Sequence, residues 1–209
     1  MSQLNLLGSC TWLTAKPILI AGLPRWLNRY GLKIKYGILK FMSCLVLCCI
    51  TVGANATTWR DAMPRAQLIG SGVLHWYGLR IYTAKLWSEY QPFDANAPYA
   101  LELTYHRNIS REQFVDTSLK EIKRIFGKRY DAATLARWQG EMQRAFLDVQ
   151  ANDQLIGVFV PNQGCDFYSA GQRLAQIRDT EFANAFFAIW FDARARHPEL
   201  SAQLRGRTP

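Results

Sequence analysis

The chain has 209 residues and a formal net charge of +9, which on its own would suggest a nucleic-acid partner. However, six of its 25 basic residues and none of its 16 acidic residues lie within residues 1–56, so the remainder has a net charge of only +3. The charge therefore comes mostly from the N-terminal quarter, and the sequence predicts no nucleic-acid partner.

The N-terminal quarter has the pattern of a secretory signal peptide. Lysines precede the apolar run Phe41–Gly53, and the small-x-small triplet Ala54–Ala56 follows it. The run has about half the length that a transmembrane helix needs, so residues 33–56 are interpreted as a signal peptide rather than a membrane anchor. Cleavage after Ala56 predicts a periplasmic or secreted protein without an integral membrane span. Residues 1–32 are interpreted as a start-site artefact or an extension.

Cysteine usage agrees with this division of the chain. Four of the five cysteines lie in the leader, and only Cys165 lies in residues 57–209. A single cysteine cannot form an intramolecular disulfide, so the hydrophobic core must stabilise this part. About 153 residues, rich in aromatic side chains, are enough for one domain.

The predicted domain begins with strands. After a short lead-in at residues 57–64, the segment Leu68–Leu74 predicts a strand in which Gly70 and Gly72 permit bending or close approach of another backbone. Residues 75–87 continue as a long strand or a hairpin, because they are rich in Trp, Tyr, Ile and Leu.

A third strand and two helices follow. Residues 99–106 alternate in polarity, which predicts a half-buried strand with one face formed by Tyr99, Leu101, Leu103 and Tyr105. Ser110 and Gln113 have the spacing of a capping box, and Gly127 predicts the end of that helix. Asp131 predicts the N-cap of the next helix.

The last block predicts a β-meander covered by one helix. Its strands are expected at Leu155–Val160 and Cys165–Tyr168, with turn residues after each. Asp179 can cap a helix whose apolar residues recur at helical spacing, namely Phe182, Ala185, Phe186, Ile189 and Trp190. Residues 192–209 predict a polar, Arg-rich tail with a short helix at Pro198–Leu204.

Strands and helices are segregated along the chain rather than alternating. The order is strands, two helices, a β-meander and a final helix. This order predicts an α+β fold in which a mainly antiparallel sheet packs against helices on one face.

No motif identifies a cofactor, a metal or a catalytic reaction. The histidines at 75, 106 and 197 lack the spacing of metal ligands, both among themselves and with Cys165. Nucleophile elbows, phosphate-binding glycine loops and dinucleotide fingerprints are also absent from the sequence. We therefore expect no metal and no cofactor, and nothing requires the protein to be an enzyme.

Several segments carry a family resemblance, in their order and spacing: Leu68–Gly72, Leu79–Leu86, Leu101–Ser110, Pro161–Tyr168 and Glu181–Trp190. They resemble the chalcone isomerase-like family, and in particular its bacterial exported branch. Together they span nearly all of the predicted domain. The resemblance implies an open-faced β-sandwich, a large antiparallel sheet backed by a layer of helices.

The plant enzymes of this family close a phenolic ring by intramolecular addition. They use an Arg, a Thr, a Lys, a Tyr, an Asn and a Thr-Met pair. In this chain Tyr130 matches the Tyr, and Lys120 lies one residue from the position of the Lys. The Arg, Thr and Asn positions are occupied by Leu74, Tyr77 and Arg137.

The Thr-Met pair is replaced by Ile189 and Trp190. The chain thus lacks the cation and the hydroxyl groups that would stabilise a phenolate and polarise a carbonyl, usually the largest catalytic contribution. This difference argues against chalcone isomerisation.

Some members of the family resemble fatty-acid binders without catalysis. This likeness favours a cleft for a small apolar or amphipathic ligand, formed by Tyr82, Ile189 and Trp190. A carboxylate of the ligand could meet Lys120, Arg80 or Arg137, with Tyr130 as a further polar group. The alternative that these side chains only fill the core remains open.

Two other functions are kept as alternatives. One is an isomerase or intramolecular lyase on an unknown substrate, with Tyr130 as acid or hydrogen-bond donor. The other is a periplasmic interaction module that uses its sheet face or the basic helix of Lys120, Lys123 and Arg124 against a protein or membrane surface. A polar-tipped cleft favours a ligand or substrate, whereas an exposed apolar patch favours an interaction surface.

Overall fold

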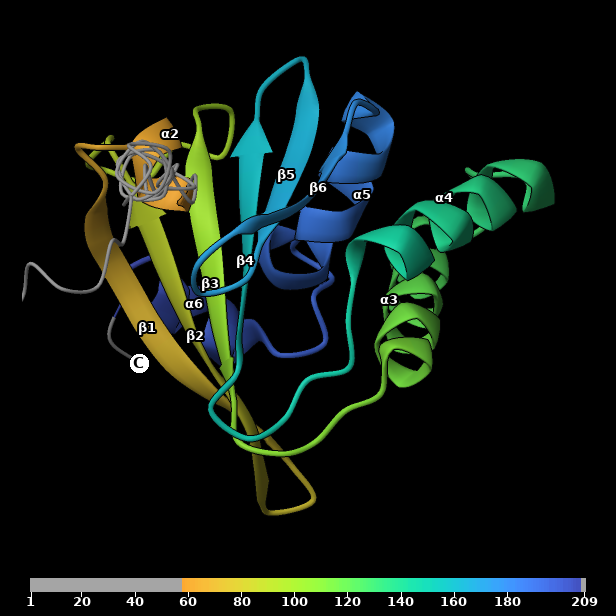
Figure 1. The fold of residues 1–209 in the computed structure, drawn as a ribbon, viewed down its shortest axis with the longest axis horizontal. Helices are drawn as coiled ribbons and strands as arrows, with labels where there is room; N and C mark the ends of the chain where they lie inside the picture. Colours follow the sequence, from red (N-terminus) through yellow and green to blue (C-terminus); the bar gives the residue numbers. More distant parts are fainter. Residues whose placement is uncertain (1–57, 208–209) are drawn as a thin grey trace, which may run out of the picture. The chain divides into compact units, whose positions relative to one another are not determined.

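The computed structural model describes residues 58–207 (Figure 1). The predicted extension at 1–32, the predicted signal peptide at 33–56 and its cleavage site lie outside the described residues. None of the described helices is long and apolar enough to cross a membrane.

Within the described residues, six strands form one antiparallel sheet in which the order in space is the order in the sequence. The strands are β1 (Gln67–Trp76), β2 (Leu79–Ser88), β3 (Tyr99–Tyr105), β4 (Gln154–Val160), β5 (Gly164–Tyr168) and β6 (Arg173–Ile177). The segment predicted as a long strand or a hairpin is a hairpin, because Trp76 pairs with Leu79 across a two-residue turn.

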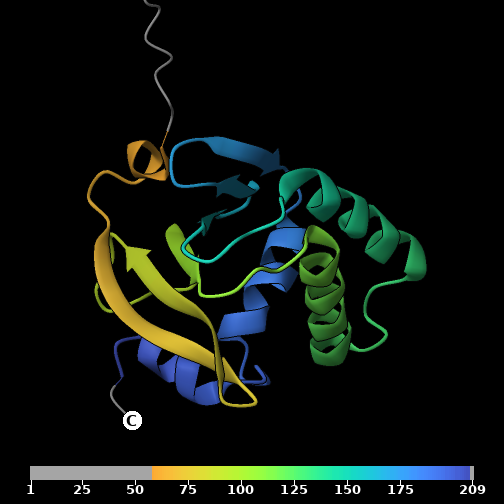
Figure 2. The ribbon, with the colours of Figure 1, turned by 60° about the horizontal axis from the view of Figure 1, so that its bottom comes forward.

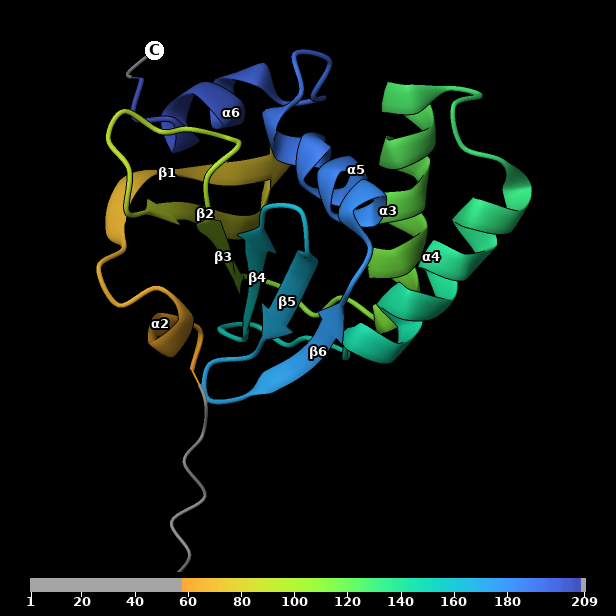
Figure 3. The same ribbon diagram turned by 90° about the horizontal axis from the view of Figure 1, so that it is seen from above.

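The described residues also form helices α2 (Trp59–Ala62), α3 (Arg111–Phe126), α4 (Ala132–Ala145), α5 (Thr180–Phe191) and α6 (Pro198–Leu204). Helices α3 to α6 lie on one face of the sheet, and the short helix α2 lies on the other (Figures 1 and 3). This arrangement confirms the predicted α+β fold and the open-faced β-sandwich that the family resemblance implied.

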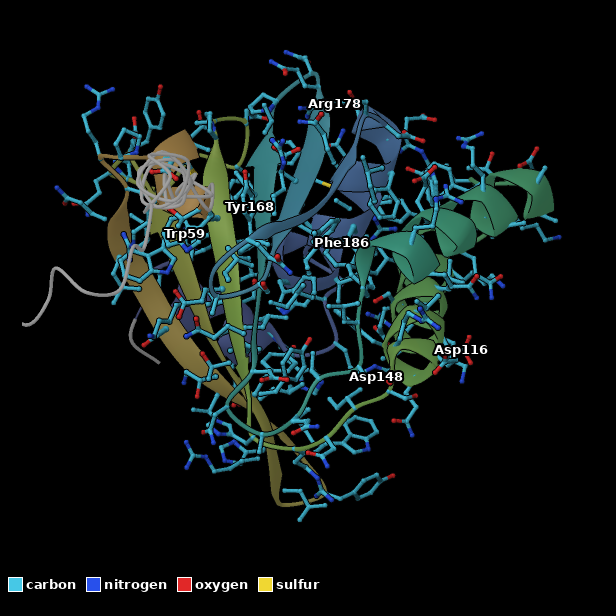
Figure 4. The ribbon with its side chains drawn as sticks, in the orientation of Figure 1. Trp59, Asp116, Asp148, Tyr168, Arg178 and Phe186 are labelled. Carbon is cyan, nitrogen blue, oxygen red and sulfur yellow. The ribbon has the colours of Figure 1, made fainter. Side chains whose placement is uncertain are left out.

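The larger hydrophobic core lies between the sheet and the four helices. Phe186 of α5 is directed into this space (Figure 4), with its ring centroid 5.3 Å from that of Phe167 in β5 and 5.9 Å from that of Phe146. Cys165 is fully buried in the same core. These contacts fix α5 against the β5 end of the sheet.

A smaller core covers the other face of the sheet. Trp59 and Met63 pack there with Ala100 and Tyr168. As a result β3 is buried on both faces, and the prediction that residues 99–106 form a half-buried strand was wrong for the outer face.

One buried carboxylate on this outer face has hydrogen-bond donors for its oxygen atoms. The carboxylate of Glu102 accepts from Nζ of Lys85 at 3.3 Å and from Nε1 of Trp87 at 3.0 Å. A buried carboxylate is tolerated only when it is paired in this way. Glu102, one of the polar residues in the alternating sequence pattern, is therefore buried rather than exposed.

The helices begin where the sequence predicts. Ser110 and Gln113 hydrogen-bond each other's backbone amides at 3.2 Å, which is the predicted capping box of α3. Asp131 and Asp179 accept hydrogen bonds from backbone amides in the first turns of α4 and α5, at 2.7 and 2.9 Å. Each carboxylate satisfies an amide that the helix itself leaves without a partner.

The C-terminal segment is less exposed than its composition predicts. Its predicted short helix is present as α6, which lies beside β1 (Figure 2), and Leu200 and Leu204 of this helix are buried. A Cβ atom on Gly70 would lie 2.6 Å from the carbonyl oxygen of Leu204, and one on Gly72 would lie 2.6 Å from Cδ1 of Leu200. The two glycines thus permit close approach, one of the two roles predicted for them.

Replacing Gly70 with alanine should force α6 away from β1, because the backbone oxygen of Leu204 cannot rotate out of the way. We expect the free energy of unfolding to fall by about 1–3 kcal/mol in a denaturant titration. Gly140→Ala is the control, since Gly140 lies inside α4 with space for a methyl group. It should raise stability by about 0.5–1 kcal/mol. An unchanged stability of Gly70→Ala would contradict the close packing of α6.

Candidate ligand-binding site

A cavity of about 460 Å³ lies between the sheet and the helices. Its walls come from β1, β2 and β3 on one side and from α3, α5 and α6 on the other. Most of its lining is apolar and includes Leu74, Ile81, Ile109, Phe114, Ile189 and Leu200. The cavity has the size and character of a site for a small organic molecule.

A β-bulge in β2 shapes one wall of this cavity. The pairing of β2 with β1 skips Ile81, so the side chains before and after it do not alternate regularly. Ile81 and Tyr82 both line the cavity, whereas the Arg80 guanidinium lies 3.5 Å from Nε2 of His106 on the outer face. A regular strand would have placed Arg80 on the same face as Tyr82.

Two predicted binding residues form a polar link between the sheet and α5. Nε1 of Trp190 donates a hydrogen bond to the Tyr82 hydroxyl oxygen at 3.0 Å. Burial raises the pKa of Tyr82 far above its ordinary value, although the hydrogen bond from Trp190 opposes this rise. The phenol therefore stays neutral and keeps its own proton as a donor.

Tyr105 adds a second hydroxyl that the sequence pattern did not mark as part of a site. Its side chain is 1% exposed, and its hydroxyl has no hydrogen-bond partner among the described residues. Its ring lies 6.0 Å from that of Tyr82 and 6.2 Å from that of Phe114, measured between centroids. Burial also raises the pKa of Tyr105 well above its ordinary value. A buried unpaired donor in an apolar cavity is suited to an oxygen atom of a ligand.

Charged groups line the mouth of the cavity. Glu121 accepts hydrogen bonds from Nε of Arg196 at 2.7 Å and from Nε of Arg124 at 2.8 Å. Burial pushes the pKa of Glu121 upward, but these hydrogen bonds and charges outweigh it and hold the pKa below its ordinary value. Arg196 is thus engaged by Glu121, and the exposed Lys120 is the other cation that lines the cavity.

His197 and Trp76 also lie at the mouth. Their ring centroids are 6.1 Å apart and the rings are nearly perpendicular. Burial lowers the pKa of His197, and the positive charge of Arg196 lowers it further. The imidazole is therefore neutral near pH 7 and adds no positive charge to the mouth.

Tyr130 and Arg137 lie away from this cavity. The Tyr130 ring centroid is 4.6 Å from that of Trp138 and 5.3 Å from that of Phe126, so Tyr130 packs between α4 and α3. The guanidinium of Arg137 lies 3.1 Å from the carboxylate of Asp179, which caps α5. Both side chains connect elements of the helical layer.

The structure therefore divides the predicted binding residues into two groups. Four of them line the cavity, namely Tyr82, Lys120, Ile189 and Trp190. Three do not, namely Arg80, Tyr130 and Arg137. The cavity also contains residues that sequence reasoning missed, above all Tyr105 and Trp76.

A second hollow, of about 880 Å³, opens beside the first between β1 and α6. It shares Leu74, Arg196, His197 and Leu200 with the smaller cavity. Its other lining residues are mostly polar or glycine, such as Glu199, Gln203 and Gly206. The smaller cavity is therefore the better site for an apolar molecule.

The polar groups of the cavity do not form a metal site. Within residues 58–207 no three His, Cys, Asp or Glu side chains lie close enough together to hold a metal ion. The cavity instead combines neutral phenols with one lysine at the mouth. This combination fits an amphipathic organic molecule.

The fold and the cavity define a class of protein, an open-faced α+β sandwich with an apolar site between sheet and helices. A family profile described as chalcone isomerase-like matches residues 64–206. The chain belongs to the chalcone isomerase-like family, as the sequence motifs suggested.

Two similar proteins extend this assignment. A protein of Haemophilus influenzae (strain ATCC 51907 / DSM 11121 / KW20 / Rd), described as uncharacterized, is 32% identical over 154 residues, which are 72% of this chain and 74% of that protein. The crystal structure of an Arabidopsis thaliana fatty-acid binding protein has a TM-score of 0.53 and 10% identity, and the match covers 73% of this chain and 90% of that one. At this identity the Arabidopsis structure shows the shared fold alone.

Tyr82→Phe and Tyr105→Phe should change stability in different directions, although each removes one buried hydroxyl from the same cavity. Tyr82→Phe leaves Nε1 of Trp190 without its acceptor, so we expect a loss of about 1 kcal/mol. Tyr105→Phe removes an unpaired hydroxyl and should be neutral or stabilising by up to about 1 kcal/mol. Denaturant unfolding of the ligand-free variants measures both. An equal loss in the two variants would contradict the unpaired state of Tyr105.

Proposed function

We propose that this protein binds a small amphipathic, fatty-acid-like molecule in the cavity between β1–β3 and α3, α5 and α6, without converting it chemically. The observation that carries the proposal is an apolar cavity that contains a buried, unpaired Tyr105 hydroxyl and has Lys120 at its mouth. The apolar part of the ligand would lie inside, and its carboxylate would meet Lys120. Tyr105 would donate to an oxygen atom of the ligand.

The volume of the cavity and the fold of the protein support this class of ligand. A cavity of about 460 Å³ lies within the range of known small-molecule sites. The Arabidopsis protein of the same fold is described as a fatty-acid binding protein. Together with the mostly apolar lining of the cavity, this likeness favours an apolar or amphipathic ligand over a highly charged one.

The geometry favours binding over the isomerase or lyase alternative. Tyr130, which would act as the acid or donor in that reaction, packs against Phe126 and Trp138 instead of lining the cavity. The phenols that do line it have pKa values raised by burial, so at neutral pH they donate hydrogen bonds but do not act as bases. These groups can hold a ligand oxygen in place.

We also propose that the protein acts after export, in the periplasm or outside the cell. The support is the sequence of residues 33–56, with its lysines, its short apolar run and its small-x-small triplet. The lone cysteine of the remaining chain is compatible with an oxidising compartment.

Binding can be tested with dodecanoate in a fluorescence displacement assay. Ile189→Trp should fill the cavity and weaken binding roughly tenfold or more. Lys120→Met keeps the length of the side chain but removes its charge. It should therefore weaken the binding of dodecanoate roughly fivefold and leave the binding of dodecanol unchanged.

Tyr130→Phe is the matched control, because Tyr130 lies outside the cavity, and it should bind like the wild type. Undetectable binding of both probes to the wild type would refute the proposed function. A loss with Tyr130→Phe as large as with Ile189→Trp would place the ligand elsewhere.

Export can be tested by the intact mass of the protein from a periplasmic fraction of a Gram-negative host. We expect a chain that begins at Thr57. Ala56→Leu should block cleavage and accumulate the precursor, because the cleavage site requires a small residue, whereas Asn55→Gln at the tolerant middle position should be processed normally. An uncleaved wild-type chain in the cytoplasmic fraction would show that the protein is not exported.

A further inference from the structure

The end of the β1–β2 hairpin exposes a group of large apolar side chains. Trp76 is 45% exposed, Tyr77 is 89% exposed and Leu79 is 51% exposed. Only Gly78 separates them in the sequence. The hairpin extends beyond both the loop that precedes α3 and the loop that follows α4 (Figure 1). We refer to residues 76–79 as the hairpin tip. Such a concentration of exposed apolar area marks an interaction site.

The backbone conformation of Tyr77 in the hairpin tip also points to a function. Tyr77 and Gly78 have φ angles of 48° and 77°, which are the left-handed conformations of a two-residue hairpin turn. Asn or Asp commonly precedes Gly in such turns, because a larger side chain is strained there. Folding alone would favour Asn at position 77. The exposed, strained tyrosine is therefore better explained by a contact outside the chain.

The hairpin is positively charged and contains no acidic residue between positions 67 and 87. His75 pairs with Arg80 directly behind the tip, and the Arg80 guanidinium lies 3.5 Å from Nε2 of His106. Arg107 follows in the adjacent loop. Asp148 and Asp153, which belong to the segment between α4 and β4, cap backbone amides. The exposed Arg80 and Arg107 therefore supply positive charge behind the apolar tip.

The tip is continuous with the candidate ligand-binding site. Trp76 lines the cavity and contacts Tyr77 edge-on, with ring centroids 5.1 Å apart. The other face of the cavity mouth is formed by His197, whose ring lies against Trp76. A surface that covered the tip would therefore lie next to the opening through which a ligand enters.

We propose that the hairpin tip inserts into the interface of an anionic lipid bilayer. Tryptophan and tyrosine prefer the boundary between headgroups and acyl chains, because each has an apolar ring and a polar atom. The basic groups behind the tip would then meet lipid phosphates. In this orientation the cavity mouth faces the membrane, so an amphipathic ligand passes between bilayer and cavity with little exposure to water. This last step rests on the proposed function, whereas the docking does not.

Docking can be tested on the full chain with vesicles of phosphatidylcholine alone and of phosphatidylcholine with phosphatidylglycerol. Hydrogen–deuterium exchange read by mass spectrometry reports on the hairpin itself, whatever other residues bind lipid. We expect slower exchange in the peptide that contains the tip when anionic vesicles are added, and less protection at high salt. The double variant Tyr77→Asn/Leu79→Ser should need a roughly tenfold higher vesicle concentration to reach the same protection. Its turn remains favourable because Asn-Gly suits it.

Tyr90→Asn is the matched control, since Tyr90 is 51% exposed but follows the end of β2 that is distant from the hairpin tip. It should retain the protection of the wild type. Dodecanoate binding without vesicles should be unchanged in the double variant, so a failure of docking and a failure of ligand binding are separable. Unchanged exchange of the tip with every vesicle would overturn the proposal and favour a protein partner. Equal protection in the double variant would also overturn it.

Discussion

The aromatic packing beneath the sheet is the constraint on which the rest of this structure depends. Around Phe186, rings from α5, β5 and the segment after α4 pack against one another between sheet and helices. Farther along the sheet, at β1 and β2, the same space is not filled and becomes the cavity. Because α5 is fixed at its packed end, its last turn carries Ile189 and Trp190 to the cavity wall. The cavity therefore exists because the helical layer packs closely against the sheet at β5 and leaves space at β1 and β2.

The second requirement is closure by the C-terminal segment. Helix α6 can reach β1 only because Gly70 and Gly72 have no side chains. The preceding residues bring Arg196 and His197 to the mouth, where Arg196 is fixed by Glu121 of α3. Three distant parts of the chain thus meet at one opening. The charge of that opening depends on the pairing of Glu121 as much as on Lys120.

Sequence reasoning succeeded where the signal was local. The caps at Ser110, Asp131 and Asp179 could be predicted because a capping side chain binds an amide within its own helical turn. The family motifs and the segregation of strands and helices likewise predicted the fold. Resemblance and periodicity predicted four of the residues that line the cavity, although their meeting in one place depends on long-range packing.

The remaining features could not be read from local patterns. The bulge at Ile81 turns Arg80 to the outer face, and nothing in the residue types around it marks a skipped pair. Tyr105 has the spacing of an ordinary core residue, and it is distinguished only because its hydroxyl has no hydrogen-bond partner within residues 58–207. Arg137 was a reasonable cation for a carboxylate, but the carboxylate that it meets is Asp179 of the same chain.

The burial of Cys165 has a consequence for the redox chemistry of the domain. Only a thiolate attacks disulfides or reacts readily with oxidants. Burial raises the pKa of the Cys165 thiol far above its ordinary value, and the nearby Asp166 carboxylate raises it further. The sulfur is also inaccessible to a second protein. Cys165, the one cysteine within residues 58–207, is therefore kept inert by the fold, and the folded domain needs no redox partner to keep this thiol reduced.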